Sequence, residues 1–209
     1  PVTGRIVLLG NQDVEISLCV PKEEMEYHYK NGSGDECLFV HFGSGTLHTS
    51  MGTLEFHKKD YIIIPKGVIY KMVFNNPEDG DPPNRFLCIE TMNTSHIMPP
   101  PRYISKKTSQ FLEHAPYCER DLRVPTLPMT CEDEGTFEVR IKARNCVHSY
   151  NYDYHPLDVV GWDGCYYPYC FNIDDFSPIV GKHHMPPPTH QTFEADLLAI
   201  CSFCPRVLD

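Results

Sequence analysis

His190 is the residue of this chain whose surroundings most favour proton transfer. It lies in the segment Pro-Pro-Pro-Thr-His-Gln-Thr-Phe-Glu at 186–194, between a run of prolines and the aromatic Phe193. The prolines restrict the backbone on one side, and Thr189 and Gln191 could orient the ring through hydrogen bonds. Because an imidazole titrates near neutral pH, His190 is suited to general acid–base chemistry. Taken alone, the residue also fits a structural interpretation as a buried, hydrogen-bonded histidine.

A second group of polar residues lies in the first seventy residues and has a spacing of its own. The group consists of Glu26-x-His28, Glu36 and Gly43, followed by Asp60, Pro65-x-Gly67 and Tyr70. This pattern resembles the two-part signature of cupin barrels. In that family three histidines and one glutamate converge on a metal inside the barrel, a ligand set that suits Fe(II), Mn(II) or Zn(II).

The pattern departs from the cupin signature at four positions. Glu26 stands where the first histidine is expected and Tyr70 where the last is expected. The glutamate is displaced to Glu36, and Lys59 replaces the usual glycine. His28 and Glu36 therefore remain as a vestigial site that could bind a hard cation weakly. The alternative is a barrel that serves as a scaffold, with His28 and Glu36 as inherited polar residues.

Short strand signals that could carry these residues run through the first part of the chain. Alternating or continuous apolar runs, separated by Gly and Pro turns, are typical of a β sandwich or barrel. We expect an all-β protein, in which a cupin-like (jelly-roll) barrel at 1–98 is followed by a linker with additional strands at 99–144. The segment 145–209 is rich in Pro and aromatic residues and is expected to be irregular, leading into the incomplete beginning of a second β domain. A short helix is expected at 109–113.

Composition excludes several classes of partner. The chain has 209 residues, and its formal net charge is 18 − 28 = −10, with no basic run. Phosphate backbones and anionic membranes require clustered Lys and Arg, so we expect neither nucleic acid nor a membrane as a partner. The ten cysteines stand mostly singly among apolar residues, which favours reduced thiols. With no visible signal peptide, we expect a cytoplasmic protein.

The two dense segments near the end of the chain closely resemble homogentisate 1,2-dioxygenase. They are Tyr-His-Pro-Leu-Asp-Val-Val-Gly-Trp-Asp-Gly at 154–164 and the proline-flanked histidine segment at 186–194, and Cys-Ser-Phe-Cys-Pro-Arg at 201–206 continues the match. The resemblance covers nearly the whole chain. It implies an Fe(II)- and O2-dependent ring cleavage of homogentisate to maleylacetoacetate in tyrosine and phenylalanine catabolism. It further implies a homo-oligomer, and His190 as the base that takes the phenolic proton.

In this family the iron ligands, two histidines and one glutamate, come from a second cupin further toward the C-terminus. The present sequence stops at Asp209 and starts at Pro1, directly before a strand-like run, so we expect a fragment. We therefore expect no iron at the family's site and no ring cleavage by this chain alone. Two alternatives remain open: a non-catalytic cupin module that binds a metal or a small acid around His28, Glu36 and Tyr70, or one half of a split dioxygenase.

Overall fold

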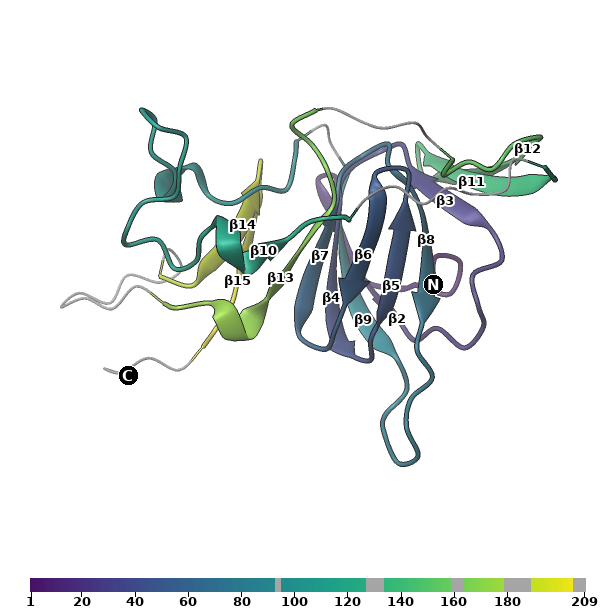
Figure 1. Cartoon of the computed structure of the whole chain (residues 1–209), viewed down its shortest axis with the longest axis horizontal. Coiled ribbons are helices and arrows are strands. Elements are labelled where there is room, and N and C mark those ends of the chain that lie inside the picture. Colours follow the sequence, from purple (N-terminus) through teal and green to yellow (C-terminus); the bar gives the residue numbers. More distant parts are fainter. Residues whose placement is uncertain (93–94, 127–133, 159–163, 179–188, 205–209) are drawn as a thin grey trace.

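The computed structural model describes residues 1–92, 95–126, 134–158, 164–178 and 189–204, and within these ranges the chain is built from strands joined by turns (Figure 1). This confirms the predicted all-β class. The first nine strands are β1 Ile6–Gly10, β2 Val14–Cys19, β3 His28–Asn31, β4 Glu36–Phe42, β5 Gly45–Thr49, β6 Gly52–Phe56, β7 Asp60–Ile64, β8 Ile69–Phe74 and β9 Arg85–Thr91. The later strands are β10 Leu122–Arg123, β11 Phe137–Ala143, β12 Cys146–Tyr152, β13 Tyr169–Asn172, β14 Gln191–Ala195 and β15 Leu198–Cys201.

Two sheets form the barrel, and a separate hairpin lies beside it (Figure 1). The larger sheet has the order β1-β2-β9-β4-β7-β13-β10, the smaller one β12-β11-β3-β8-β5-β6, and β14 pairs with β15. Strands from beyond residue 98 join both sheets, since β11 runs parallel to β3 and β13 runs antiparallel to β7. Each sheet therefore combines strands from before residue 98 with strands from after it, and from both sides of residue 144. The division of the chain at residues 98 and 144 remains a proposal about domain organisation.

Strand β7 explains why part of the sequence is continuously apolar. Its residues 61–64 read Tyr-Ile-Ile-Ile, and all of them are buried. Successive side chains of a strand point to opposite faces, so a strand covered on both sides needs apolar residues at every position. Ile62 and Ile64 pack into the barrel core, whereas Tyr61 and Ile63 pack into a second core cluster. This second cluster includes Phe193 and Ile200 of the β14–β15 hairpin.

The cupin-like turns keep their backbone conformations even where the sequence departs from the pattern. Gly43 has φ +105° and Gly67 has φ +88°, both in the left-handed region that glycine tolerates. Lys59, which stands in place of the usual glycine, also has a positive φ, of 74°. Residue 59 therefore has the left-handed backbone conformation that glycine tolerates, although the lysine side chain makes this conformation strained.

Two local expectations need correction. No helix forms at 109–113, because Ser109 adopts φ +58° and Phe111 makes an isolated bridge with Ile104. The helical elements of the described residues are three 3₁₀ turns: η1 Pro101–Tyr103, η2 Glu119–Asp121 and η3 Ile173–Asp175. Strands β12, β13 and β14 lie in the region that the sequence indicated to be largely irregular. β13, in particular, is only four residues long and is stabilised by pairing with β7, which no local pattern reveals.

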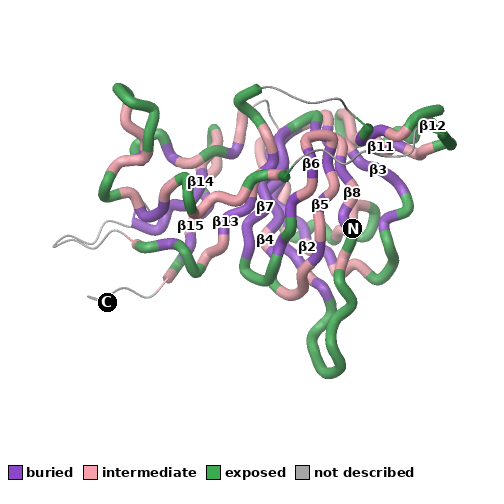
Figure 2. Tube along the Cα trace, viewed as in Figure 1, coloured by how far each residue is buried: buried purple, intermediate pink, exposed green. Residues whose placement is uncertain are grey.

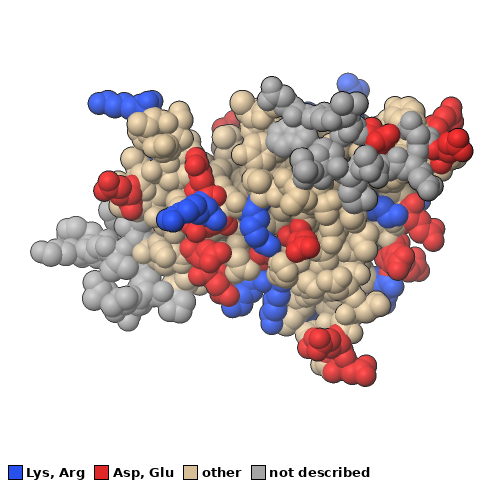
Figure 3. All heavy atoms as spheres, viewed as in Figure 1, with Lys and Arg blue, Asp and Glu red and all other residues tan. Residues whose placement is uncertain are grey.

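Burial is concentrated in the barrel strands and beneath the β14–β15 hairpin, whereas most of β12 and the loop at 75–83 are exposed (Figure 2). Acidic and basic side chains are interspersed on the face shown in Figure 3. In the described part of the chain, no helix has the length and hydropathy that a bilayer span requires. The nine cysteines of that part are free thiols.

Candidate functional site

His190 lies directly before β14 and is only 5% exposed. Its Nδ1 is 3.2 Å from the carbonyl oxygen of Ser202, and the Ser202 amide donates to the His190 carbonyl at 2.7 Å. A carbonyl oxygen can only accept, so Nδ1 carries the proton of the neutral ring. This assigns the lone pair to Nε2, which is the form of imidazole that accepts a proton from a substrate.

Ser202 is itself held by two hydroxyl groups. Its Oγ lies 2.5 Å from Thr192 Oγ1 and 3.1 Å from the hydroxyl of Tyr61. Tyr61 belongs to β7, so the residue that orients His190 is connected to the barrel. On the other side, the His190 ring contacts the ring of Phe203, with 4.9 Å between centroids.

Gln191, which the sequence offered as an orienting partner, has a different role. Its Oε1 accepts a hydrogen bond from Arg102, and its Nε2 donates to Glu194 Oε2 at 2.6 Å. The Tyr103 hydroxyl donates to the Gln191 carbonyl at 2.7 Å. Gln191 therefore fastens the hairpin to η1. Thr189 is buried next to His190 in the chain.

Sequence reasoning missed Ser202 and Tyr61. The register of a hairpin between 191–195 and 198–201 could have indicated Ser202. When Gln191 pairs with Cys201, the next residues outward, His190 and Ser202, lie opposite each other. Nothing local could have indicated Tyr61, which is 141 residues from Ser202. Of the two segments that carry the resemblance, residues 159–163 and 186–188 lie outside the described residues.

The barrel interior holds Glu36 and Tyr70, as the cupin-like pattern predicts. Glu36 is fully buried, and the Tyr70 hydroxyl donates to its Oε2 at 2.8 Å. The third member is Arg5, whose guanidinium donates to Glu36 Oε1 and, at 3.2 Å, to the Tyr70 hydroxyl oxygen. Burial, followed by the negative charge of Glu36, raises the pKa of Tyr70. The phenol therefore stays protonated and can donate.

A second carboxylate lies beside Glu36. Glu90 is the direct antiparallel neighbour of Glu36 on β9, and like charges at such positions repel. Burial, then the proximity of Glu36, raises the pKa of Glu90. Lys142 lies 2.7 Å from Glu90 Oε1, and Arg5 lies 4.0 Å from Glu90 Oε2. Two protein cations thus compensate two buried carboxylates.

The structure does not bring His28 to Glu36. Tyr29, the next residue on β3, faces the interior and packs against Tyr70 at 5.5 Å between centroids, so His28 points to the outer face of the sheet. There its ring contacts His155, with 5.1 Å between centroids. Among the described residues, no group of three or more His, Cys, Asp or Glu side chains could hold a metal ion. The iron that the resemblance implies does not fit the barrel interior, where the Glu36 carboxylate is paired with Arg5.

A two-sheet barrel with Gly43, Asp60 and Gly67 at the positions of the two-part pattern defines a cupin-type β-barrel protein. Among solved structures, the cupin 2 conserved barrel domain protein of Leptotrichia buccalis is similar at 14% identity and a TM-score of 0.36, over 42% of this chain and 39% of that one.

The sequence model of one family, described as homogentisate 1,2-dioxygenase N-terminal, matches residues 7–173. The chain belongs to this family. A provisionally named dioxygenase of Saccharolobus solfataricus is 34% identical over 98% of this chain and 51% of its own length. Homogentisate 1,2-dioxygenase of Bradyrhizobium diazoefficiens is 26% identical over 80% of this chain and 35% of its own length. The chain thus spans from about a third to about half of the length of these relatives.

Proposed function

We propose that this chain is the N-terminal part of a ring-cleaving dioxygenase that acts on homogentisate, with O2 as co-substrate and maleylacetoacetate as product. Membership of the homogentisate 1,2-dioxygenase N-terminal family supports the reaction class. The similarity of 26% to a homogentisate 1,2-dioxygenase supports the substrate. Nine free thiols among the described cysteines are compatible with the cytoplasm, where we place the protein.

The single observation that carries this proposal is the hydrogen bond between His190 Nδ1 and the Ser202 carbonyl, which leaves Nε2 as a proton acceptor. In the proposed role, Nε2 takes the phenolic proton of the substrate. The residue that orients the ring is itself anchored, since the Ser202 hydroxyl is bonded to Thr192 and Tyr61. A base held in one orientation needs no reorganisation when the proton moves.

We propose that residues outside the described part of the chain hold the iron. Among the described residues, no group of three or more His, Cys, Asp or Glu side chains could hold a metal ion. We propose that the complete protein supplies these ligands from a second cupin, or that a separate chain does so in a split enzyme. The complete protein is proposed to form a homo-oligomer. The third possibility, a binding module that uses the barrel interior, has less support because Arg5 is bonded to Glu36 and Tyr70.

Oxygen uptake with homogentisate and added Fe(II) tests the proposal. This chain alone is expected to show no uptake above a control without protein. The protein extended to the full length of its reading frame is expected to be active. In that longer protein, His190→Gln should lower kcat by about 10²- to 10⁴-fold, the usual contribution of a general base.

The matched control is His114→Gln, which changes an exposed histidine of a loop and should leave kcat unchanged. Steady-state uptake by the present chain would contradict the assignment of the iron to other residues. A fully active His190→Gln variant would contradict the assignment of the base.

A further inference from the structure

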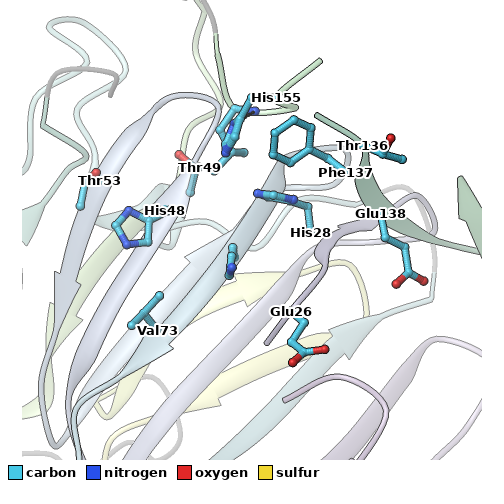
Figure 4. Close-up of a pocket in the computed structure, with 12 residues that line it drawn as sticks. Glu26, His28, His48, Thr49, Thr53, Val73, Thr136, Phe137, Glu138 and His155 are labelled. Atoms are coloured by element: carbon cyan, nitrogen blue, oxygen red, sulfur yellow. Dashed lines mark hydrogen bonds between the residues drawn. The ribbon is translucent and has the colours of Figure 1, made fainter. Parts of the chain in front are cut away.

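A cavity of about 410 Å³ lies on the outer face of the smaller sheet, on the opposite side of the strands from the Arg5–Glu36 pair. Strand alternation creates it. Tyr29, Leu47 and Tyr70 point into the barrel core, so their neighbours His28, His48 and Lys71 point outward. Figure 4 shows His28 and His48 directed into the same space, with His155 and Phe137 above them.

Two buried polar atoms that line this cavity lack a hydrogen-bond partner among the described residues: His48 Nδ1 and Thr53 Oγ1. An unsatisfied buried polar atom is costly, and native structures normally provide a partner for it. Both atoms lie on the neighbouring strands β5 and β6, where their residues are paired in register. Both atoms are therefore available to hydrogen-bond a molecule in the cavity.

The charge at the cavity is positive on one side. Among the residues that the structure describes, the Lys71 ammonium makes no ion pair. Burial, followed by the proximity of His155 and Lys71, lowers the pKa of His28 to about 4, and burial followed by Lys71 lowers the pKa of His48. Both rings are therefore neutral at pH 7 and can make hydrogen bonds, while Lys71 carries the charge.

The carboxylates at the rim do not neutralise Lys71. Glu138 is bonded to Arg140 at 2.7 Å and to the Ser149 hydroxyl at 2.6 Å, so its charge is already paired. Glu26 is exposed, and among the described residues its carboxylate makes no ion pair with Lys71. An anion inside the cavity would thus meet the Lys71 ammonium, the His48 ring and the Thr53 hydroxyl.

The remaining wall is aromatic. The rings of His28, Phe137 and His155 meet edge to face, with centroid separations of 4.7 Å, 5.1 Å and 6.3 Å. Aromatic rings prefer such edge contacts, and a further ring could add to the cluster. The volume falls within the range of small-ligand pockets.

We propose that this cavity is a binding site for a small carboxylate with one aromatic ring, distinct from the His190 site. Lys71 forms the ion pair with the carboxylate, and His48 Nδ1 and Thr53 Oγ1 supply hydrogen bonds. The ligand ring packs against Phe137 and His155. A metal ion is not the occupant, because the described histidines and carboxylates do not form a three-ligand cluster.

Titration of the full chain with benzoate, followed by NMR of the histidine Cε1–H resonances, tests this site. Benzoate should shift the resonances of His28, His48 and His155 and leave that of the exposed His114 in place. Benzyl alcohol has the same ring without the charge and should shift none of them. Inorganic phosphate has charge without the ring and should bind more weakly than benzoate.

Lys71→Gln should weaken benzoate binding by about tenfold, the usual effect of losing one charged hydrogen bond. Lys107→Gln removes an exposed lysine away from the cavity and should have no effect. Thr53→Val, which keeps the side-chain shape, should weaken binding several-fold. The proposal is overturned if millimolar benzoate moves none of the three resonances, if benzyl alcohol or phosphate binds as well as benzoate, or if Lys71→Gln binds like the wild type. The wild-type titration decides the question even where a variant fails to fold.

Discussion

Arg5 shows how a single residue changes the chemistry of a barrel. Its guanidinium donates to Glu36 and Tyr70, and it lies within 4.0 Å of Glu90. A barrel interior with two buried carboxylates needs positive charge, and here Arg5 and Lys142 supply it. The side chain that pairs with Glu36 comes from a segment that precedes the cupin-like pattern in the sequence.

Replacing Arg5 with Met is expected to lower the free energy of unfolding by about 3–5 kcal/mol, because it leaves a buried carboxylate uncompensated. Urea denaturation measures this loss. Arg120→Met, at an exposed position of η2, is the control and should change stability by less than about 0.5 kcal/mol. The double variant Arg5→Met/Glu36→Gln should recover part of the loss, and a double variant as unstable as Arg5→Met would refute the electrostatic explanation.

His28 makes the stability of the folded protein depend on pH. Its pKa in the folded protein is lowered to about 4, first by burial and then by His155 and Lys71, from an ordinary value of 6.5. Between pH 6.5 and 4 the unfolded chain binds a proton at this position that the folded chain does not. The contribution of His28 therefore makes the protein less stable as the pH falls through this window.

His28→Gln should reduce the loss of stability between pH 7 and pH 5, as measured by urea denaturation at both values. His114→Gln changes an exposed histidine and should leave that loss unchanged. A Cε1–H resonance of His28 that titrates near pH 6.5 in the folded protein would rule out this account.

At the scale of elements, the β14–β15 hairpin depends on its packing against the barrel. Phe193 is fully buried, and its ring contacts those of Tyr61, Tyr117, Tyr169 and Phe171 at centroid separations of 5.7–6.1 Å. Tyr117 also donates a hydrogen bond to the Thr192 carbonyl. A two-stranded hairpin is only marginally stable alone, so these contacts hold His190 in place.

Phe193→Ala is expected to cost about 3–5 kcal/mol, as large-to-small changes of buried aromatic residues do. Hydrogen exchange should show the largest loss of protection in β14 and β15, with a smaller loss in β4 and β9. Phe203→Ala removes a ring that is 76% exposed and should cost much less. Equal loss of protection in all strands would show that the hairpin is not a separate unit of stability.

At the scale of the whole molecule, the larger sheet has an uncovered edge at β1. All five residues of β1 are exposed, and Ile6 and Leu9 are 65% and 67% accessible. The bulge between Val7 and Leu9 interrupts the pairing with β2 but does not cover the outer edge. Apolar edge strands pair readily with other chains unless a charge prevents it.

Leu9→Lys is therefore expected to reduce self-association of this chain, because a lysine on an edge strand opposes intermolecular pairing. Light scattering over a concentration series measures the effect. Leu197→Lys is the control, since Leu197 is 81% exposed but lies in the β14–β15 turn rather than on a sheet edge. If both variants associate like the wild type, the β1 edge is not the contact.

The sequence by itself determined the all-β class and the turns at Gly43 and Gly67, because strand alternation and turn residues are local signals. It also singled out His190, Glu36 and Tyr70, since residue type and spacing mark them. Only the tertiary structure decided which of these residues meet. Arg5 reaches Glu36 from 31 positions away, Tyr61 reaches Ser202 from 141, and His28 is turned away from Glu36 by the strand alternation that directs Tyr29 inward. Such contacts depend on sheet register and on which face of a strand becomes covered, and both are set by packing between segments far apart in the chain.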